Sequence, residues 1–344
     1  MTSLLYVSDN RMIDLMPLNI ITSQPDPSKL PANYAISLDD FNAISLSGED
    51  QTKYLQGQVT CDVNSLSDDS LTHGAHCDAK GKVLSVFRLI NRAGKHLLLQ
   101  SKASIPLSLA ALKKFGAFAK VTISATTQLN FVALIGDNAS TLLQQTFSKV
   151  PDISHPVVQA DTTTLVYIAG KQARYLVIDE SEVITQLLKK FNLPIYNQLV
   201  WQLTEIQEGF PVLTQGSLEQ YVPQMLNLHA INGISFTKGC YLGQETVARM
   251  QYLGKNKRAL FALSSDKAIE LNIEIAAGDI IEKQLGENWR KAGDVLASYK
   301  ADNQISLQAV LANDVDKNTV FRLKAQPEVI FAITQLPYSL NQED

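Results

Sequence analysis

One eight-residue stretch combines the residue types most capable of chemistry in this chain, and it reads Lys238-Gly239-Cys240-Tyr241-Leu242-Gly243-Gln244-Glu245. We call it the cysteine turn. A thiolate is a strong nucleophile, and a nearby lysine or free backbone amides lower the pKa of a thiol. The sequence therefore predicts Cys240 as a redox or transfer thiol, with Lys238 and the turn amides stabilising its thiolate. The alternative is that Cys240 is a small buried residue, as most free cysteines are.

The flanks of the cysteine turn predict where it sits. Apolar residues alternate over residues 231–237, which predicts a short strand, and residues 246–253 have helical character that ends at Gly254. The thiol would then lie at a strand-to-helix transition. We expect Gln244 to bind a ligand or cap the turn, and Glu245 to pair with Arg249 four residues later.

Composition bounds the class of protein. The chain has 344 residues, 45% of them hydrophobic and 19% charged, which suits one large or two to three modest domains. A net charge of −4 provides no global basic field, so no DNA contact is expected. Cys61, Cys77 and Cys240 form an odd, sparse set without metal-ligand spacing, and Cys61 and Cys77 are expected to be buried. We expect a soluble, cytoplasmic protein with no bound metal and no membrane contact.

The first two thirds of the chain mix helices and strands. Residues 1–34 hold three prolines in seven positions near their end, which predicts an N-terminal arm. Residues 35–254 are expected to form one α+β region, with a β-hairpin over 71–78 and 82–91 and helices over 106–115 and 196–208. Within it, strands and helices alternate over about 117–195 in a split β-α-β order typical of a ferredoxin-like layer.

The last ninety residues change character. Residues 255–344 contain short β-like runs and no helical pattern, which predicts a small antiparallel β-barrel. The expected strands lie at residues 259–263, 279–282, 294–299, 305–311 and 320–323. The likeliest junction is Lys255-Asn256-Lys257-Arg258, so the predicted fold class is α+β followed by a barrel.

The cysteine turn resembles the signature K-G-C-[FY]-x-G-Q-E of the YgfZ family of folate-binding proteins linked to tRNA modification. Further stretches that resemble family landmarks are residues 56–60, 75–82, 208–211 and 256–260, so the resemblance covers most of the chain. It implies the fold of the glycine cleavage T protein: a folate-binding domain with a ferredoxin-like layer, followed by a C-terminal antiparallel barrel.

The resemblance also implies a function. Family members are expected to bind tetrahydrofolate and to sustain iron–sulfur enzymes, among them those that methylthiolate tRNA. The implied partners are iron–sulfur enzymes or assembly factors, so the effect on tRNA would be indirect. A link to control of the ATP-bound replication initiator is also attributed to the family.

Two positions match folate contacts of the family, and a third departs from the T-protein pattern. Trp201 matches a tryptophan in the helix before E-x-G-F-P, and Phe41 matches an aromatic residue after L-D-D; either ring could stack on a pterin, or simply pack in the core. Gln207 stands where T proteins carry a glutamate that grips the pterin. Glutamine has one acceptor oxygen and no charge, so that grip would be weakened or transferred to another group.

The residues available for catalysis distinguish three hypotheses about function. T proteins place an aspartate pair where this chain has Ser85 and Val86, so classical aminomethyl transfer is not expected. A folate-dependent one-carbon transferase with Cys240 as nucleophile is a second hypothesis. A third is a direct tRNA-binding module, whose basic patch would comprise Lys238, Arg249, Lys255, Lys257 and Arg258. We favour the folate-binding accessory factor.

Overall fold

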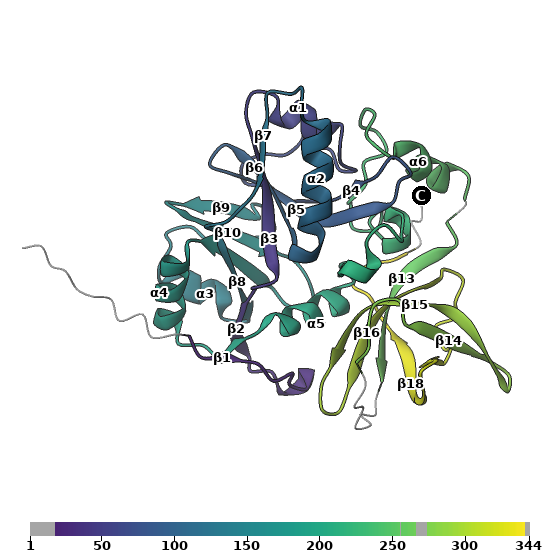
Figure 1. The fold of residues 1–344 in the computed structure, drawn as a ribbon. Coiled ribbons are helices and arrows are strands. Elements are labelled where there is room, and N and C mark those ends of the chain that lie inside the picture. Colours follow the sequence, from purple (N-terminus) through teal and green to yellow (C-terminus); the bar gives the residue numbers. More distant parts are fainter. Residues whose placement is uncertain (1–17, 255, 266–273, 341–344) are drawn as a thin grey trace, which may run out of the picture.

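Two β-sheets and a β-barrel make up the molecule in a computed structural model that describes residues 18–254, 256–265 and 274–340 (Figure 1). The α+β class and the C-terminal antiparallel barrel are as predicted. None of the helices in these ranges is long and apolar enough to cross a membrane.

The first sheet has seven strands, and α3 (Ala139–Gln144) and α4 (Ser181–Phe191) pack on one of its faces. Its spatial order is β1 (Ile20–Ile21), β12 (Ile195–Tyr196), β2 (Asn33–Ser37), β8 (Asn130–Gly136), β11 (Arg174–Asp179), β10 (Thr163–Ile168) and β9 (Val157–Ala160). Of the strands predicted within residues 117–195, those at 131–135, 165–168 and 175–178 lie in this sheet, whereas the strand at 121–124 pairs in the second sheet. Strands from earlier in the chain, β1 and β2, complete the sheet.

The predicted N-terminal arm needs a correction. It contains β1, which pairs in parallel with β12, and a short 3₁₀ helix η1 (Pro27–Lys29). The Tyr299 hydroxyl of the barrel donates a hydrogen bond of 2.8 Å to the carbonyl of Pro25. The prolines keep its elements short, but the described part of the arm is tied to the sheet and to the barrel.

The second sheet has five antiparallel strands, and helices cover its outer face. The strand order is β4 (Thr72–Cys77), β5 (Val83–Arg92), β6 (Lys95–Ser101), β3 (Phe41–Ser47) and β7 (Thr122–Ala125). The covering helices are α1 (Gln51–Gln56) and α2 (Ile105–Phe115), and the 3₁₀ helix η2 (Lys102–Ser104) leads directly into α2. The predicted hairpin is β4–β5, and Pro106 lies in the first turn of α2, where its missing N–H costs nothing.

The barrel is closed and antiparallel. Its order is β13 (Arg258–Ser265), β16 (Ile305–Ala312), β15 (Asn288–Lys300), β14 (Ile280–Leu285), β17 (Phe321–Leu323) and β18 (Gln326–Thr334). Each of the five predicted strands is present within a longer or shifted strand. The sixth strand, β18, was missed; it pairs with both β13 and β17 and thereby closes the barrel.

A long connection carries the chain from the sheets to the barrel. It contains α5 (Gln198–Glu208), the 3₁₀ helices η3 (Gln215–Ser217) and η4 (Pro223–Leu226), and α6 (Gln244–Tyr252). The strand predicted over residues 231–237 is wrong. Asn232 has a left-handed φ of 57°, and the Gly233 N–H donates to the Leu228 carbonyl over 2.7 Å, so the backbone turns there. The apolar side chains of this stretch pack against the core from a loop.

Helix α5 lies where both sheets and the barrel meet (Figure 1). Its Asn197 cap accepts a hydrogen bond from the Leu199 N–H. The buried side chains of α5, which include Val200, Trp201 and Leu203, belong to a core cluster with residues from both sheets and the barrel. The orientation of this one helix therefore sets how the three parts pack.

A buried charge cluster fixes that orientation. Glu205 of α5 accepts from Arg88 of β5 through both carboxylate oxygens, each at 2.9 Å, and from Arg174 of β11 at 2.5 Å. The exposed fractions of these three residues are only 2–3%. We call the three residues the Arg–Glu–Arg cluster; it joins the two sheets through α5.

Replacing Glu205 with glutamine should destabilise the protein strongly. Two buried guanidinium groups would lose their counter-charge, which typically costs about 3–5 kcal/mol. The free energy of unfolding in denaturant measures the loss. Glu245→Gln is the matched control, because its ion pair with Arg249 is exposed and should contribute little. Equal, small losses in both variants would contradict the structural role of the cluster.

Candidate functional site

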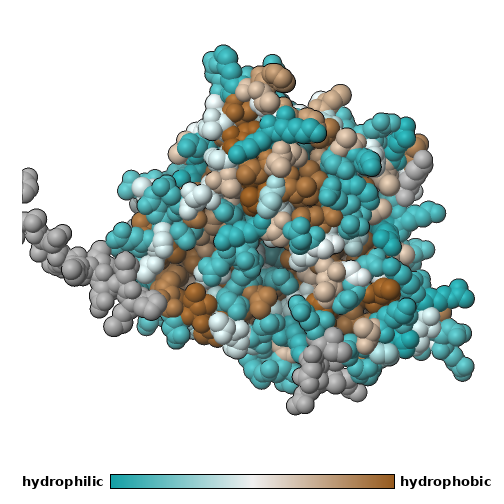
Figure 2. Space-filling model, viewed as in Figure 1, coloured by the Kyte–Doolittle hydropathy of each residue, from teal (hydrophilic) through white to brown (hydrophobic). Residues whose placement is uncertain are grey.

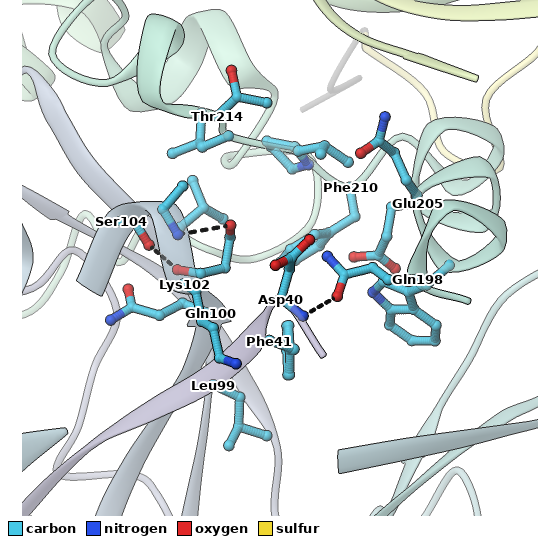
Figure 3. Close-up of a pocket in the computed structure, with 18 residues that line it drawn as sticks. Asp40, Phe41, Leu99, Gln100, Lys102, Ser104, Gln198, Glu205, Phe210 and Thr214 are labelled. Atoms are coloured by element: carbon cyan, nitrogen blue, oxygen red, sulfur yellow. Dashed lines mark hydrogen bonds between the residues drawn. The ribbon is translucent and has the colours of Figure 1, made fainter. Parts of the chain in front are cut away.

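A cavity of about 500 Å³ lies between the second sheet and α5 (Figure 3). On the face of Figure 2, apolar side chains gather around a hollow near the middle of the molecule. The cavity walls come from β3, β5, β6, η2, α5 and the loop after α5. The lining residues are Asp40, Phe41, Val86, Leu99, Gln100, Ser101, Lys102, Ala103, Ser104, Gln198, Trp201, Gln202, Glu205, Phe210, Pro211, Val212, Leu213 and Thr214.

The structure brings both predicted folate aromatics, Phe41 and Trp201, to this one cavity. Trp201 is 4% exposed, and the guanidinium carbons of Arg88 and Arg174 lie 5.7 and 5.1 Å from its ring centroid. Phe41 packs edge-to-face on Phe131 at 5.6 Å between centroids. Two fixed aromatic rings at one cavity are suited to a flat heterocyclic ligand.

Polar groups mark one side of the cavity. Gln198 accepts a hydrogen bond from the Asp40 N–H (Figure 3). The carbonyl of Asp40 in turn accepts one of 2.7 Å from the Lys102 N–H. The Lys102 side chain is exposed, whereas Glu205 is buried at the other side. The cavity is therefore apolar with a polar, partly cationic edge.

Gln207 does not line this cavity. It lies in a separate hollow of about 310 Å³ with Lys171 and Glu208. Two residues along an α-helix are turned by roughly 200°, so Gln207 and Glu205 face opposite ways, whereas Glu205 shares a face with Trp201 four positions earlier. Gln207 thus lies apart from Phe41 and Trp201, and the acidic side chain that lines their cavity is Glu205.

The sequence carries a signal for the buried charges. Arg88 interrupts an otherwise apolar run in β5, and an arginine in the middle of such a strand must be paired if it is buried. Its partner Glu205 lies 117 positions away in the chain. Only the folded chain identifies that partner.

Ser85 and Val86 occupy the positions of the T-protein aspartates. Val86 lines the cavity, whereas Ser85 faces the other side of β5, where its hydroxyl donates to Ser108 over 3.3 Å. The cavity therefore presents an apolar side chain at one of these positions and nothing from the other. Neither position therefore supplies a carboxylate to the wall of the cavity.

In the cysteine turn, Cys240 is exposed, which rules out the alternative that it is a buried residue. Cys61 and Cys77 are buried as predicted, and burial raises the pKa of the Cys61 thiol to about 12. Cys240 is thus the one cysteine of the chain that a solvent-borne reagent or partner reaches. It does not line the aromatic cavity.

Lys238 hydrogen-bonds to groups other than the Cys240 thiol, so its predicted role in stabilising the thiolate stays a prediction. Its ammonium is directed into the fold, where it donates to the carbonyls of Val59 at 2.8 Å and Cys61 at 2.6 Å. Burial lowers the pKa of Lys238 to about 8. The role of this lysine is to fasten the cysteine turn to residues 59–61.

Glycines lock the cysteine turn to the β4–β5 hairpin. Gly243 has a φ of +82°, and a Cβ there would lie 2.5 Å from the Asp78 carbonyl oxygen. At Gly81, in the hairpin, a Cβ would lie 2.8 Å from the Cβ of Thr246. Gly239 differs, because it is exposed and a Cβ there would meet nothing within 4 Å.

The remaining residues of the turn have structural positions. Tyr241 is buried, and its carbonyl accepts a hydrogen bond from the Gln244 N–H. Helix α6 begins at Gln244, two residues before the predicted start. Glu245 and Arg249 form the predicted pair at 2.6 Å, with both side chains mostly exposed. An exposed pair of this kind contributes little to stability.

The proposed tRNA-binding patch is not assembled as predicted. Lys238 is buried and Lys255 lies outside the described residues, while Arg258 is 3.7 Å from the carboxylate of Asp294.

Among the residues described, no group of three or more His, Cys, Asp or Glu side chains is arranged to hold a metal ion.

Comparison with known proteins places the chain in a family. Residues 256–326 match a family model described as "YgfZ, beta-barrel domain". A "tRNA-modifying protein YgfZ" of Colwellia psychrerythraea (strain 34H / ATCC BAA-681) is 60% identical over 329 residues, which cover 95% of this chain and 100% of that protein. This chain belongs to the YgfZ family. A Yersinia enterocolitica protein of the same name is 40% identical over 92% of this chain and 95% of its own length.

The fold is shared more widely than the YgfZ family. The glycine cleavage system aminomethyltransferase T from Bartonella henselae superposes with a TM-score of 0.67, covering 89% of this chain and 86% of its own, at 11% sequence identity. That identity is low, so the likeness shows a common fold. It confirms the T-protein-like architecture that the YgfZ signature implied.

Replacing Lys238 with methionine should destabilise the fold without slowing the thiol. The Val59 and Cys61 carbonyls would lose their donor, at a cost of about 2 kcal/mol. Because the pKa of Lys238 falls from 10.5 to about 8 on folding, the unfolded chain binds more protons between these values. The wild-type free energy of unfolding should therefore rise with pH there, relative to the variant.

Denaturant unfolding at several pH values tests the stability claim. The alkylation rate of Cys240 by iodoacetamide under native conditions tests the other, with Cys240→Ser as the blank. If Lys238→Met slows alkylation severalfold while the protein stays folded, Lys238 activates the thiol as the sequence predicted.

Proposed function

We propose that this protein is a folate-binding accessory factor of the cytoplasm that supports iron–sulfur enzymes and, through them, tRNA modification. Tetrahydrofolate or a derivative would occupy the cavity of Phe41 and Trp201. The exposed Cys240 would act as a redox or transfer thiol toward a protein partner. A further effect on replication initiation would follow indirectly from the same activity.

The observation that carries this proposal is the aromatic cavity. Two rings that the YgfZ resemblance assigned to folate, 160 positions apart, line one space of about 500 Å³, which is within the usual range for a small-molecule site. Glu205 is the buried acceptor there, but its oxygens already accept from two arginines. Folate would therefore be held mainly by stacking and by the polar edge, in which the exposed Lys102 suits the carboxylates of the glutamate tail.

The relatives support the tRNA part of the proposal. Proteins of 60% and 40% identity carry the name "tRNA-modifying protein YgfZ". The chain itself has a net charge of −4, and Lys238 is buried rather than displayed. An effect on tRNA through partner enzymes suits this charge better than direct phosphate binding does.

A folate-dependent one-carbon transferase is the second candidate, and two observations disfavour it. Val86 presents an apolar side chain to the cavity where T proteins have a carboxylate, and Cys240 is absent from the cavity lining. A nucleophile must approach the reacting carbon to about 3–3.5 Å. The geometry thus favours a protein that binds folate in the cavity and carries a thiol that acts outside it.

Trp201→Phe should weaken folate binding about threefold to tenfold, because the smaller ring loses stacking worth about 0.5–1.5 kcal/mol. Titration calorimetry with 5-formyltetrahydrofolate measures the affinity. Trp289→Phe is the matched control, since Trp289 lies in the barrel against Arg322, outside the cavity. Absence of binding to the wild type at millimolar ligand, or equal losses in both variants, would count against the folate site.

Cys240→Ser should abolish function in a host that lacks its own YgfZ protein. Wild type is expected to restore methylthiolated tRNA nucleosides, measured by mass spectrometry of digested tRNA, and the variant is not. Cys61→Ser is unsuitable as a control because Cys61 is buried, so Glu245→Gln, on the surface of the same turn, serves instead. Equal rescue by wild type and Cys240→Ser would leave the thiol without a role.

A further inference from the structure

A second hollow, of about 440 Å³, lies beside the Arg–Glu–Arg cluster and apart from the proposed folate cavity. Arg88 and Arg174 line it, whereas Glu205 faces the aromatic cavity instead. Phe210 lines both spaces and separates them. The two arginines therefore pair with Glu205 and also line the second hollow, which Glu205 does not line.

The charges at this hollow do not balance. Among the buried groups, Arg88 and Arg174 are positive and Glu205 is negative, so the Arg–Glu–Arg cluster itself carries one surplus positive charge. Glu208 is half-buried at the edge of the hollow, and Lys171 is exposed, with its Nζ donating to the Gln335 carbonyl. His73 also lines the hollow, but burial lowers its pKa to about 4, which leaves it neutral at physiological pH. A surplus positive charge on arginines that are only 2–3% exposed is costly to bury, and an anion bound against them would lower that cost.

Hydrogen bonding shows the same deficit. The Nε–H groups of Arg88 and Arg174 are buried, and neither has an acceptor among the residues that the structure describes. Buried donors of this kind are normally satisfied, and guanidinium groups pair best with planar oxyanions. Both unpaired donors belong to the residues that carry the excess charge.

We propose that this hollow is an anion-binding site that takes a carboxylate carried on an apolar or aromatic body. The carboxylate would lie against Arg88 and Arg174. The body would contact Phe210, Ile168, Ile231 and Tyr338, which also line the hollow. This apolar lining favours an organic carboxylate over inorganic sulfate or phosphate, whose hydration it does not replace.

The site has a built-in reporter, because the chain has two tryptophans and both arginines flank the ring of Trp201. In a Trp289→Phe background, titration with sodium benzoate should change the Trp201 emission saturably, and sodium chloride at equal ionic strength should not. A parallel titration with sodium sulfate tests whether an inorganic anion binds as well. Benzoate should also raise the melting temperature.

Arg174→Gln should weaken benzoate binding about tenfold or more, since a charged hydrogen bond is lost, while Arg88 and Glu205 remain a balanced pair. Arg322→Gln is the matched control, because Arg322 is a half-buried arginine paired with Glu282 in the barrel. If Arg174→Gln does not fold, Ala169→Phe replaces it, since an exposed residue at the rim would then obstruct the hollow.

Each outcome bears on the proposal. Saturable benzoate binding that is lost in Arg174→Gln or Ala169→Phe and kept in Arg322→Gln supports it. No saturable response in the wild type, or unchanged binding in both hollow variants, overturns it. Sulfate binding as tight as that of benzoate overturns the carboxylate class. Calorimetry with 5-formyltetrahydrofolate in Ala169→Phe separates this site from the folate cavity, because Ala169 lines this hollow alone and folate binding should persist there.

Discussion

The Arg–Glu–Arg cluster is the interaction on which the rest of the structure depends. A buried ion pair rarely adds much stability over apolar packing, because desolvation offsets the attraction between the charges. Its directional hydrogen bonds do fix geometry. Glu205 can accept from Arg88 and Arg174 together only if α5 lies between the two sheets in one rotation and at one height. That rotation also places Trp201 in the aromatic cavity.

The same cluster explains why two hollows of different character lie back to back. Glu205 faces the aromatic cavity with its charge already engaged, so that space is close to neutral. Arg88 and Arg174 face the other hollow with positive charge in excess. One set of three side chains thus divides the interior into a space suited to a flat ring and a space suited to an anion.

Local features of this structure could be read from the sequence, and long-range ones could not. Pro106 at a helix start, the β4–β5 hairpin and the alternating barrel strands each depend on neighbouring residues. The pairing of β1 with β12, the closure of the barrel by β18 and the direction of Lys238 depend on partners far along the chain. The family resemblance points to Gln207, whereas the rotation of α5 turns Glu205 toward the cavity and Gln207 away from it.

The cysteine turn separates residues that serve the fold from residues that serve chemistry. Lys238 and Tyr241 are buried, and Gly243 adopts a backbone conformation and a close contact that a side chain would disrupt. Gly239 and Cys240 are exposed, and at Gly239 there is free space where a side chain could stand. A glycine that the fold does not require, next to an exposed thiol, keeps the approach to that thiol open. The buried residues therefore anchor a rigid support, and the thiol it displays meets its reaction partner from outside the molecule.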